Sequence, residues 1–431
     1  STALRRQGSH VRIVSGAPIA SSLRVAAVNA PSPGEAAAAR AVAVSTTAFL
    51  LVAPVTSSSG LRMGLLVAAA LALGHLAWHH GRDRLAGPLP AGLAIAFGAW
   101  ALLALASAAW SVNPAYSLGE FKREVGYNAF AFGVFFLAAR SPARVRLWAG
   151  ALLAGALLLG LFEIARASAV PQWDFWHGGP GRFSTHLALV APLALLVVAR
   201  PPEGFGRGRT ALATLLAVLF VVTLDTRNRM AWIAYLAALA VLAATLAPMV
   251  TPVARRRAAV AVLALGVALA GLFAISVVQK SEEFYPQAGS ARESLELDLR
   301  PTLWRLAGAA IEERPWLGHG FGREILEPRF RAGAGEANRE YATHAHNVFL
   351  NVTISLGFPG LALFVVLIGA LVHAHGRRLA NPGTRVLAAL GLAVVTAFVV
   401  KSLTDDFFGR HNALVFWALN GMLLGPGARA R

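Results

Sequence analysis

Residues 258–278 read AAVAVLALGVALAGLFAISVV, an apolar run without a charged residue. Arg255, Arg256 and Arg257 stand directly before it, and Lys280 follows after one glutamine. An α-helix needs about 20 consecutive apolar residues to cross the hydrocarbon core of a membrane. The stretch therefore predicts a membrane-spanning helix with charged residues at both ends.

Runs of this kind recur along most of the 431-residue chain. The composition is 56% hydrophobic and 14% charged, with a mean hydropathy of +0.59, which is too apolar for an ordinary soluble domain. No Cys is present, so disulfides and thiolate metal ligands are excluded. We expect an all-α polytopic membrane protein with about twelve transmembrane helices, near 41–56, 61–79, 90–110, 125–139, 147–165, 183–199, 210–224, 230–248, 258–278, 346–374, 384–400 and 410–425.

An even number of spans divides the loops into two sets, one on each side of the membrane. The set that includes both termini holds 21 of the 39 Lys and Arg and only three acids, whereas the other set holds 18 cations and 18 acids. The whole formal net charge of +18 thus falls on one face. Loops rich in Lys and Arg face the cytoplasm, so this face and both termini are predicted to be cytoplasmic. The basic composition then requires no nucleic acid partner.

The predicted spans divide the chain into five parts: a disordered cytoplasmic tail at 1–40, spans one to nine at 41–278, an outer loop at 279–345, spans ten to twelve at 346–425, and a cytoplasmic tail at 426–431. The outer loop is polar but contains helix-forming stretches, such as 303–313, with Pro301 at a plausible first helical position. We expect it to be an ordered helical lid and not a spacer.

Several arginines on the outer face break the charge bias. Arg227 and Arg229 stand directly before a span, Arg182 follows the glycine-rich run 178–181, and Arg300 precedes Pro301. An Arg at membrane depth is costly unless it is paired or binds an anion, and its planar fork suits phosphate. Several of these side chains converging on one pocket would suit a diphosphate. The alternative interpretation is salt bridging to the equal number of outer acids.

His344 and His346 lie at the end of the outer loop, directly before a predicted span. An imidazole can accept a proton near neutral pH, so either histidine is a candidate general base for a sugar hydroxyl. If the helix starts at Asn347, both histidines precede it and need not share a face. The alternatives are a capping or packing pair, or a metal site with Glu336 and Glu340, for which no tight ligand set is present. We predict no metal site and no cofactor.

Three weaker patterns lie on the same face. Gly318-His319-Gly320-Phe321-Gly322 is interpreted as a turn in the lid, because no strand precedes it and no Lys-Ser/Thr follows. Asp405-Asp406 and Glu296-Leu297-Asp298 could bind a divalent cation, but we interpret them in preference as solvated or salt-bridged acids. The first outer loop, 55–62, contains no acid, which argues against glycosyltransferases that place a carboxylate there.

Several short motifs resemble the O-antigen ligase family of Gram-negative bacteria, over roughly residues 45–425. The motifs are His344-Ala345-His346-Asn347-Val348-Phe349-Leu350, Gly357-Phe358-Pro359-Gly360, Asn228-Arg229-Met230-Ala231-Trp232, Arg300 with Trp304, and Pro315-Trp316-Leu317-Gly318-His319-Gly320. The family usually has Ser-Arg-Gly where this chain has Asn228-Arg229-Met230. Arg227 therefore stays an alternative to Arg229 as the equivalent arginine.

The resemblance implies a GT-C-like glycosyltransferase that transfers a glycan from undecaprenyl diphosphate to a sugar hydroxyl of the lipid A core. Reaction would take place on the periplasmic side of the bacterial inner membrane, without metal, nucleotide or other cofactor. The resemblance implies that Arg229 and Arg300 hold the diphosphate and that His346, ranked above His344, deprotonates the acceptor. Arg182, Lys122 and Arg123 are weaker candidates for the same anion or for acceptor phosphates.

Two other functions stay open on the sequence. An O-antigen polymerase or an O-oligosaccharyltransferase of the same superfamily would use a similar donor with a different acceptor. A transporter or flippase for an anionic lipid would use the same arginines without a reaction, although transporters favour charges at the membrane midplane. In each case the expected partners are membrane lipids, here undecaprenyl-diphosphate-linked O-antigen and the lipid A core, and no nucleic acid.

Overall fold

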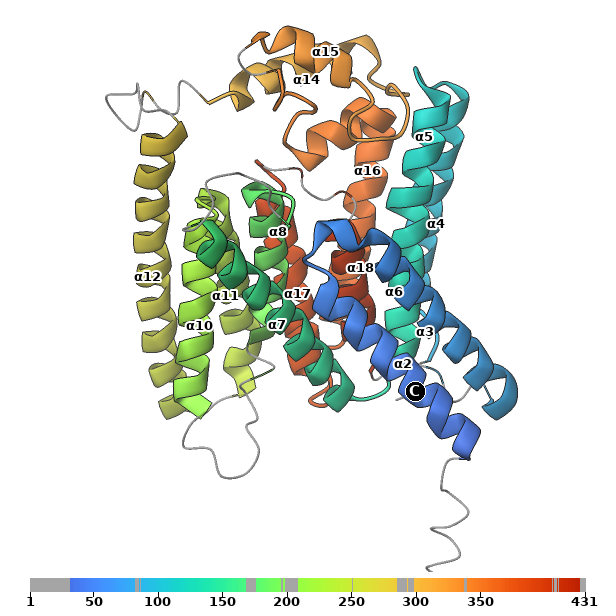
Figure 1. Cartoon of the computed structure of the whole chain (residues 1–431), viewed down its shortest axis with the longest axis vertical. Coiled ribbons are helices and arrows are strands. Elements are labelled where there is room, and N and C mark those ends of the chain that lie inside the picture. The colour runs from blue at the N-terminus through green and yellow to red at the C-terminus, as the bar shows by residue number, and fades with distance from the viewer. Residues whose placement is uncertain are drawn as a thin grey trace, which may run out of the picture.

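The computed structural model describes residues 32–81, 85, 87–167, 176–194, 197, 208–249, 251–284, 293, 298–336, 339–404, 406, 409 and 411–426. Within these residues the regular structure is helical and no strand is present. Figure 1 shows a bundle of helices side by side, with a smaller group of helices above one end. The predicted all-α architecture is confirmed.

Each predicted span coincides with a helical segment. The helix bounds are α2 Pro33–Val52, α3 Ser59–His80, α4 Ala91–Ala106, α7 Pro142–Ala167, α8 Pro180–Val190, α10 Gly208–Asp225, α11 Arg229–Leu246, α12 Pro252–Phe284, α16 Val348–Gly376, α17 Arg385–Lys401 and α18 His411–Leu424. The stretch predicted at 125–139 is part of a longer helical segment, which consists of α5 Pro114–Glu120, the π-helical η4 Phe121–Gly126 and α6 Tyr127–Ala138. The two helices above the bundle are α14 Arg300–Glu313 and α15 Glu327–Gly333.

Seven helices among the described residues are long and apolar enough to cross a membrane, which establishes a polytopic membrane protein. The other predicted spans are shorter, and several of them lie inside the bundle. All residues of α18 are buried, and α18 packs against α6, α8 and α17. Twelve spans therefore stay a prediction, because a short enclosed helix does not show by its length whether it crosses the membrane.

Three predicted boundaries are wrong. Helix α2 begins at Pro33 and not near 41, because the Ser32 side chain accepts a hydrogen bond from Glu35 N at 3.2 Å and so caps the helix. Residues 33–40 are thus helical, whereas residues 1–31 lie outside the described residues. Helix α12 continues through 279–284, because polar residues can extend a helix beyond the apolar run that crosses the membrane.

The third wrong boundary concerns 111–123, which was predicted to be an outer loop. The Asn113 side chain accepts a hydrogen bond from Tyr116 N at 3.1 Å and starts α5, with Pro114 in its first turn. Helices α5 and α6 are then joined through the π turn of η4.

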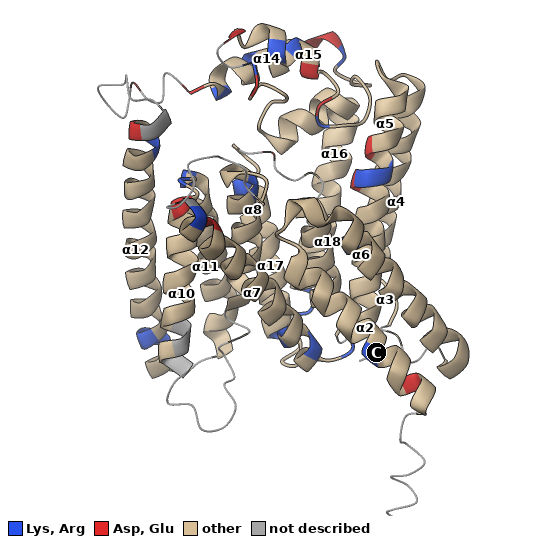
Figure 2. Ribbon diagram, viewed as in Figure 1, with Lys and Arg blue, Asp and Glu red and all other residues tan. Residues whose placement is uncertain are grey.

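The two ends of the bundle differ in charge, in line with the predicted loop sets. Helix α2 starts at the end opposite α14 and α15 (Figure 1). Figure 2 shows Lys and Arg at this same end, at the start of α7 and of α12. Which end faces the cytoplasm stays a prediction from the positive-inside rule.

Two of the motifs quoted from the sequence pack against each other. In the loop after α14, His319 N and Gly320 N donate to Ile354 O and Ser355 O, both at 2.9 Å. Phe358 N of α16 donates in return to Pro315 O at 2.8 Å. The predicted turn at 318–322 is therefore part of the connection between α14 and α15. This connection docks on the kink of α16, where backbone carbonyls accept its hydrogen bonds.

Gly357 makes this docking possible. Its backbone is left-handed, with φ of 66°, and a Cβ added there would lie 2.5 Å from the backbone carbonyl of Trp316. We expect Gly357→Ala to lower the free energy of unfolding by about 3 kcal/mol, because the new Cβ strains the left-handed backbone and displaces the segment around Trp316. Thermal unfolding in detergent measures this. Gly369→Ala on the same helix, where a Cβ meets nothing within 4 Å, is the matched control and should not lower stability.

Candidate functional site

The two histidines stand just before α16, as predicted. The N-cap of this helix is Asn347, whose Oδ1 accepts hydrogen bonds from Phe349 N at 2.9 Å and Leu350 N at 3.1 Å. The rings of His344 and His346 stack with centroids 4.2 Å apart. Because Asn347 caps the helix, neither histidine is needed for capping.

His346 is more accessible than His344. His344 is only 4% exposed, and its Nδ1 lies 2.6 Å from Thr343 Oγ1, whereas His346 is half-buried. His346 Nε2 lies 3.2 Å from Tyr341 O. A carbonyl can only accept, so Nε2 carries the hydrogen, and in the neutral ring Nδ1 carries the basic lone pair. The structure thus favours His346 over His344 as a base.

The backbone of His346 is unusual. Among the described residues, only Arg227 and His346 are non-glycine residues with positive φ, at 51° and 50°. Such a conformation costs free energy and persists only where surrounding contacts impose it, often at functional sites. Both residues had been singled out from the sequence, and one of them is the candidate base.

A second cluster forms around Asp298, just before α14. Its Oδ2 lies 2.9 Å from Arg300 Nη1 and 3.5 Å from Arg229 Nη2. These three residues and Lys280 line a cavity of about 280 Å³, the Arg300 cavity. The structure therefore brings Arg229 and Arg300 together although they are far apart in sequence. Arg227 is not among the residues that line this cavity.

Three cations and one carboxylate are among the described residues that line the Arg300 cavity. Burial raises the pKa of Asp298, but Arg300, Lys280 and Arg229 outweigh burial and hold the pKa below its usual value. Asp298 is therefore ionised at neutral pH. The three cations that line the cavity suit an anionic ligand such as a diphosphate.

The connection after α17 links the two clusters. The carbonyl oxygens of residues 402, 403 and 404 accept hydrogen bonds from Val348 N at 3.1 Å, Asn347 Nδ2 at 2.8 Å and Arg300 Nε at 2.7 Å. One short segment thus binds both the residue that follows His346 and the guanidinium of Arg300. This arrangement places the candidate base beside the candidate anion site.

Helix α14 makes a further contact to the histidine segment. Trp304 Nε1, one turn after Arg300, donates to Ala345 O at 3.0 Å. The pair Arg300 and Trp304, noted in the sequence, therefore has a structural reason: one side chain lines the anion cavity and the other holds the residue before His346.

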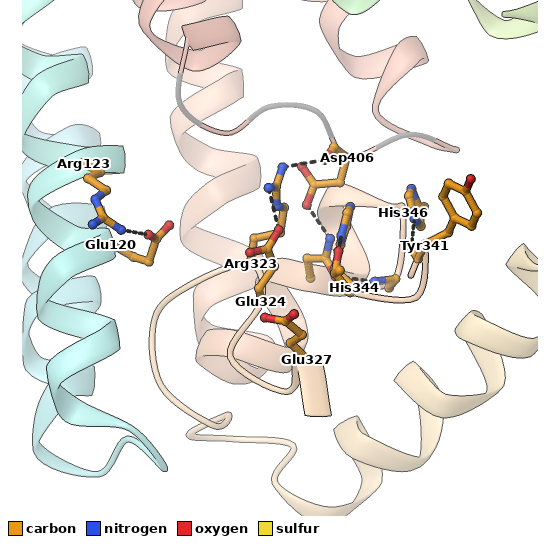
Figure 3. A network of polar contacts seen from close by, with 12 residues as sticks. Glu120, Arg123, Arg323, Glu324, Glu327, Tyr341, His344, His346 and Asp406 are labelled. Atoms are coloured by element: carbon orange, nitrogen blue, oxygen red, sulfur yellow. Dashed lines mark hydrogen bonds and ion pairs between the residues drawn. The ribbon is translucent and has the colours of Figure 1, made fainter. Parts of the chain in front are cut away.

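A buried polar network supports the same segment from the other side. Asn351 Nδ2 donates to Asp406 Oδ2, and Asn351 Oδ1 accepts from Ala345 N at 3.0 Å. Arg323 donates to Asp406 O at 3.0 Å and pairs with Glu324 at 2.8 Å. Figure 3 shows Asp406 between Arg323 and the segment of the two histidines. Sequence reasoning missed Asn351 and gave Asp406 no such role.

We expect Asn351→Leu to reduce the transfer rate proposed below by about 10- to 100-fold, because the side chain that fixes Ala345 beside His346 is lost. The substitution also leaves the buried carboxylate of Asp406 and the backbone N–H of Ala345 without Asn351 as a partner. The free energy of unfolding should therefore fall by about 2 kcal/mol. Turnover and donor affinity, measured separately, check the prediction. Thr353→Val, two residues along α16, is the control, because Thr353 Oγ1 bonds only Phe349 O within the helix. A fall in donor affinity with unchanged turnover would contradict this positioning role.

The other predicted binding residues lie elsewhere. Arg123 and Arg182 line a separate cavity of about 620 Å³, together with Arg62, which the sequence analysis did not select. Lys122 is exposed and is not among the lining residues of either cavity. These three cations therefore lie apart from the Arg300 cavity, and their predicted roles, in binding the same anion or acceptor phosphates, stay predictions.

His177, in the loop before α8, makes the stability of this region sensitive to pH. It is buried and stacks on Phe183 with ring centroids 4.3 Å apart, and burial lowers its pKa to about 4. The unfolded chain takes up this proton at about pH 6.5, so the free energy of unfolding falls as pH drops from 6.5 towards 4. We expect about 2 kcal/mol of this loss at pH 5, and His177→Phe should remove it in thermal unfolding at pH 7 and pH 5. His373→Phe, at an exposed site, should keep the wild-type loss.

No group of three or more His, Asp or Glu suited to a metal is present within the described part of the chain. Asp405 and Glu296, from the weak acidic patterns, lie outside the described residues.

No curated protein matches the chain. Residues 212–365 match the family model described as O-antigen ligase, a segment that runs from α10 through Arg229, Arg300 and His346 into α16. This match confirms the resemblance read from the motifs: residues 212–365 are similar to the O-antigen ligase family.

Proposed function

We propose that the protein is an O-antigen ligase, which transfers a glycan from undecaprenyl diphosphate to a sugar hydroxyl of the lipid A core. The family match supports an enzyme of the O-antigen ligase and polymerase superfamily. The observation that carries the proposal is the segment 402–404, which binds both Asn347, next to His346, and Arg300. A base and an anion site held by one segment suit a displacement that releases a diphosphate.

In the proposed reaction, the acceptor hydroxyl oxygen bonds to the anomeric carbon of the donor glycan. The bond from that carbon to the diphosphate oxygen breaks, and the diphosphate takes the electron pair. A direct displacement of this kind inverts the anomeric carbon. It requires two things from the protein, namely a base for the hydroxyl proton and positive charge for the leaving group.

Arg229 and Arg300 supply the positive charge. The two guanidinium groups already share one carboxylate, Asp298, so their spacing suits bridging by a small anion. Each charge-assisted hydrogen bond to the leaving diphosphate contributes about 1.5–3 kcal/mol. Lys280 adds a third cation to the same cavity.

His346 is the proposed base. Its Nε2–H donates to Tyr341 O, which orients the ring and leaves Nδ1 to take the acceptor proton. His344 is the second histidine of the motif; it stacks on His346, and we assign it a supporting role because it is buried. We propose that the reaction needs no metal ion or cofactor, and that it occurs on the periplasmic face of the inner membrane in a GT-C-like fold of twelve spans.

A transfer assay with purified full-length protein tests the proposal. The protein receives undecaprenyl-diphosphate-linked glycan and lipid A core in the presence of EDTA, and glycosylated lipid A core is the expected product. Polymerised donor without lipid A core product would indicate a polymerase of the same superfamily. No product under any condition, with lipid moved between the leaflets of a vesicle, would overturn the enzyme assignment in favour of a flippase.

A further inference from the structure

The larger cavity, of about 620 Å³, lies apart from the proposed reaction site and is here named the Arg62 cavity. Three elements contribute arginines to it: Arg62 from α3, Arg123 from η4 and Arg182 from α8. His411 lies at its wall at the start of α18. No carboxylate is among the described residues that line it.

Arg62 is the least expected member of this group. It is only 5% exposed, although it belongs to the first turns of a helix long and apolar enough to cross a membrane. Its guanidinium donates to Ala53 O at 2.9 Å and Thr56 O at 3.4 Å, and no carboxylate of the described residues pairs with it. A buried guanidinium whose charge is not neutralised is costly, so the site favours an anion.

The cavity is built by close backbone packing and not by a chance approach of long side chains. Thr56 N and Oγ1 donate to Trp176 O at 2.9 and 2.8 Å, which ties the α2–α3 turn to the loop before α8. Gly178 has φ of 74°, and a Cβ there would lie 2.7 Å from Thr56 Cγ2 and 3.3 Å from Arg182 Cδ. Gly178 therefore lets the segment of Arg182 pack against the α2–α3 turn, which precedes Arg62.

Arg123, from η4, is the third arginine that lines the cavity. It pairs with Glu120 at 2.8 Å, and its side chain is half exposed. It belongs to the π turn of η4, a distortion that is frequent at functional sites because it redirects side chains. Figure 2 shows the Lys and Arg of η4 and of α8 on the side of the bundle that faces α14 and α15.

We propose that the Arg62 cavity binds a phosphate group, separately from the diphosphate site at Arg300. The two cavities share no lining residue among those that the structure describes. Thr404, which follows α17, lines the Arg300 cavity, and His411, the first residue of α18, lines the Arg62 cavity. Three arginines, of which Arg62 is buried and has no carboxylate partner among the described residues, suit the double charge of a phosphate monoester. The inference rests on the proposed function in one respect: the phosphate would be carried by the acceptor glycolipid, which must enter beside the donor.

Binding measurements on the full-length protein in phosphatidylcholine nanodiscs test this inference. The probes are a bisphosphorylated acylated disaccharide lipid, the same lipid without its phosphates, and inorganic phosphate as a competitor. We expect loss of the phosphates to weaken binding by about 10- to 100-fold, since each lost charge-assisted bond costs about 1.5–3 kcal/mol. Arg123→Gln and Arg182→Gln should each weaken binding of the phosphorylated lipid about tenfold and leave the dephosphorylated lipid unaffected.

Arg62→Gln is expected to act in the same way, but Arg62 also holds two carbonyls, so the Arg123 and Arg182 variants decide the outcome if the Arg62 variant does not fold. Arg256→Gln, an exposed arginine at the opposite end of the bundle, is the matched control and should bind like wild type. Displacement of the lipid by inorganic phosphate at equal affinity would identify free phosphate, and not a lipid headgroup, as the source of the bound group.

Equal binding of the two lipids, or wild-type binding by both the Arg123 and Arg182 variants, would overturn the inference. The measurement involves no transfer step, so its failure is distinct from failure of the proposed function. A protein that binds the phosphorylated lipid in this way but forms no product would retain the phosphate site and lose the ligase assignment.

Discussion

Replacing His346 by alanine is expected to reduce glycan transfer by about 10²- to 10⁴-fold, the usual contribution of a positioned general base. The acceptor proton then has no receiving group beside the anion site, whereas the arginines of the Arg300 cavity stay in place. Affinity for undecaprenyl diphosphate should therefore remain within about twofold of wild type. Turnover in the transfer assay and equilibrium binding of the donor, measured on the same preparations, check both parts.

Two companion variants separate catalysis from packing. His373→Ala removes an exposed histidine at the other end of α16 and should transfer glycan at the wild-type rate. His344→Ala removes the ring that stacks on His346 and should reduce the rate less than His346→Ala does, because His344 is buried and is held at Thr343. If His344→Ala abolishes transfer and His346→Ala does not, the roles of the two histidines are reversed.

The helices were the part of the fold that the sequence predicted best, because apolar length is a direct physical requirement of a membrane-spanning helix. Residues 258–278 illustrate this, since they form the central part of α12. Boundaries were less accurate where a capping side chain, such as Ser32 or Asn113, started a helix outside the apolar run. Capping depends on one hydrogen bond, which hydropathy does not report.

The candidate site was predicted in part. Arg229, Arg300 and His346 were selected from their sequence context and from the family resemblance, and the structure places them in one region. The residues that hold this region together were missed: Asn351 lies in an apolar helix, and its partner Asp406 is 55 positions away. A single polar residue in an apolar stretch carries no sign of a distant partner, so only the fold reveals the network.

Arg62 was missed for a related reason. From the sequence it is one cation near the start of an apolar run, where an arginine commonly extends to the membrane surface. In the structure it is buried and lines one cavity with Arg123 and Arg182 from two later elements. The grouping depends on the Gly178 contact and on the π turn of η4, neither of which can be derived from composition or periodicity.

Removing either arginine of the Arg300 cavity is expected to weaken donor binding. Arg300→Ala and Arg229→Ala each delete a guanidinium that faces the proposed diphosphate, at a cost of about 1.5–3 kcal/mol, or about 10- to 150-fold in Kd. Arg300→Ala should have the larger effect, because Arg300 also donates to Thr404 O and so holds the segment beside His346. Arg305→Ala is the control: Arg305 lies on α14 too, but it is exposed and bonds only Thr302.

Substitution of Asp298 is expected to change the affinity of the same cavity for diphosphate in the opposite direction. Asp298→Asn keeps an oxygen that can accept from Arg300 N, now at 3.0 Å from Oδ1, but removes the negative charge that competes with the donor. Diphosphate should then bind a few-fold more tightly, and its affinity should fall more steeply with salt, because the cavity has gained one net positive charge. Titration of undecaprenyl diphosphate at low and high ionic strength measures both effects. Weaker binding by the Asp298 variant, together with unchanged binding by Arg229→Ala, would show that the diphosphate does not occupy this cavity.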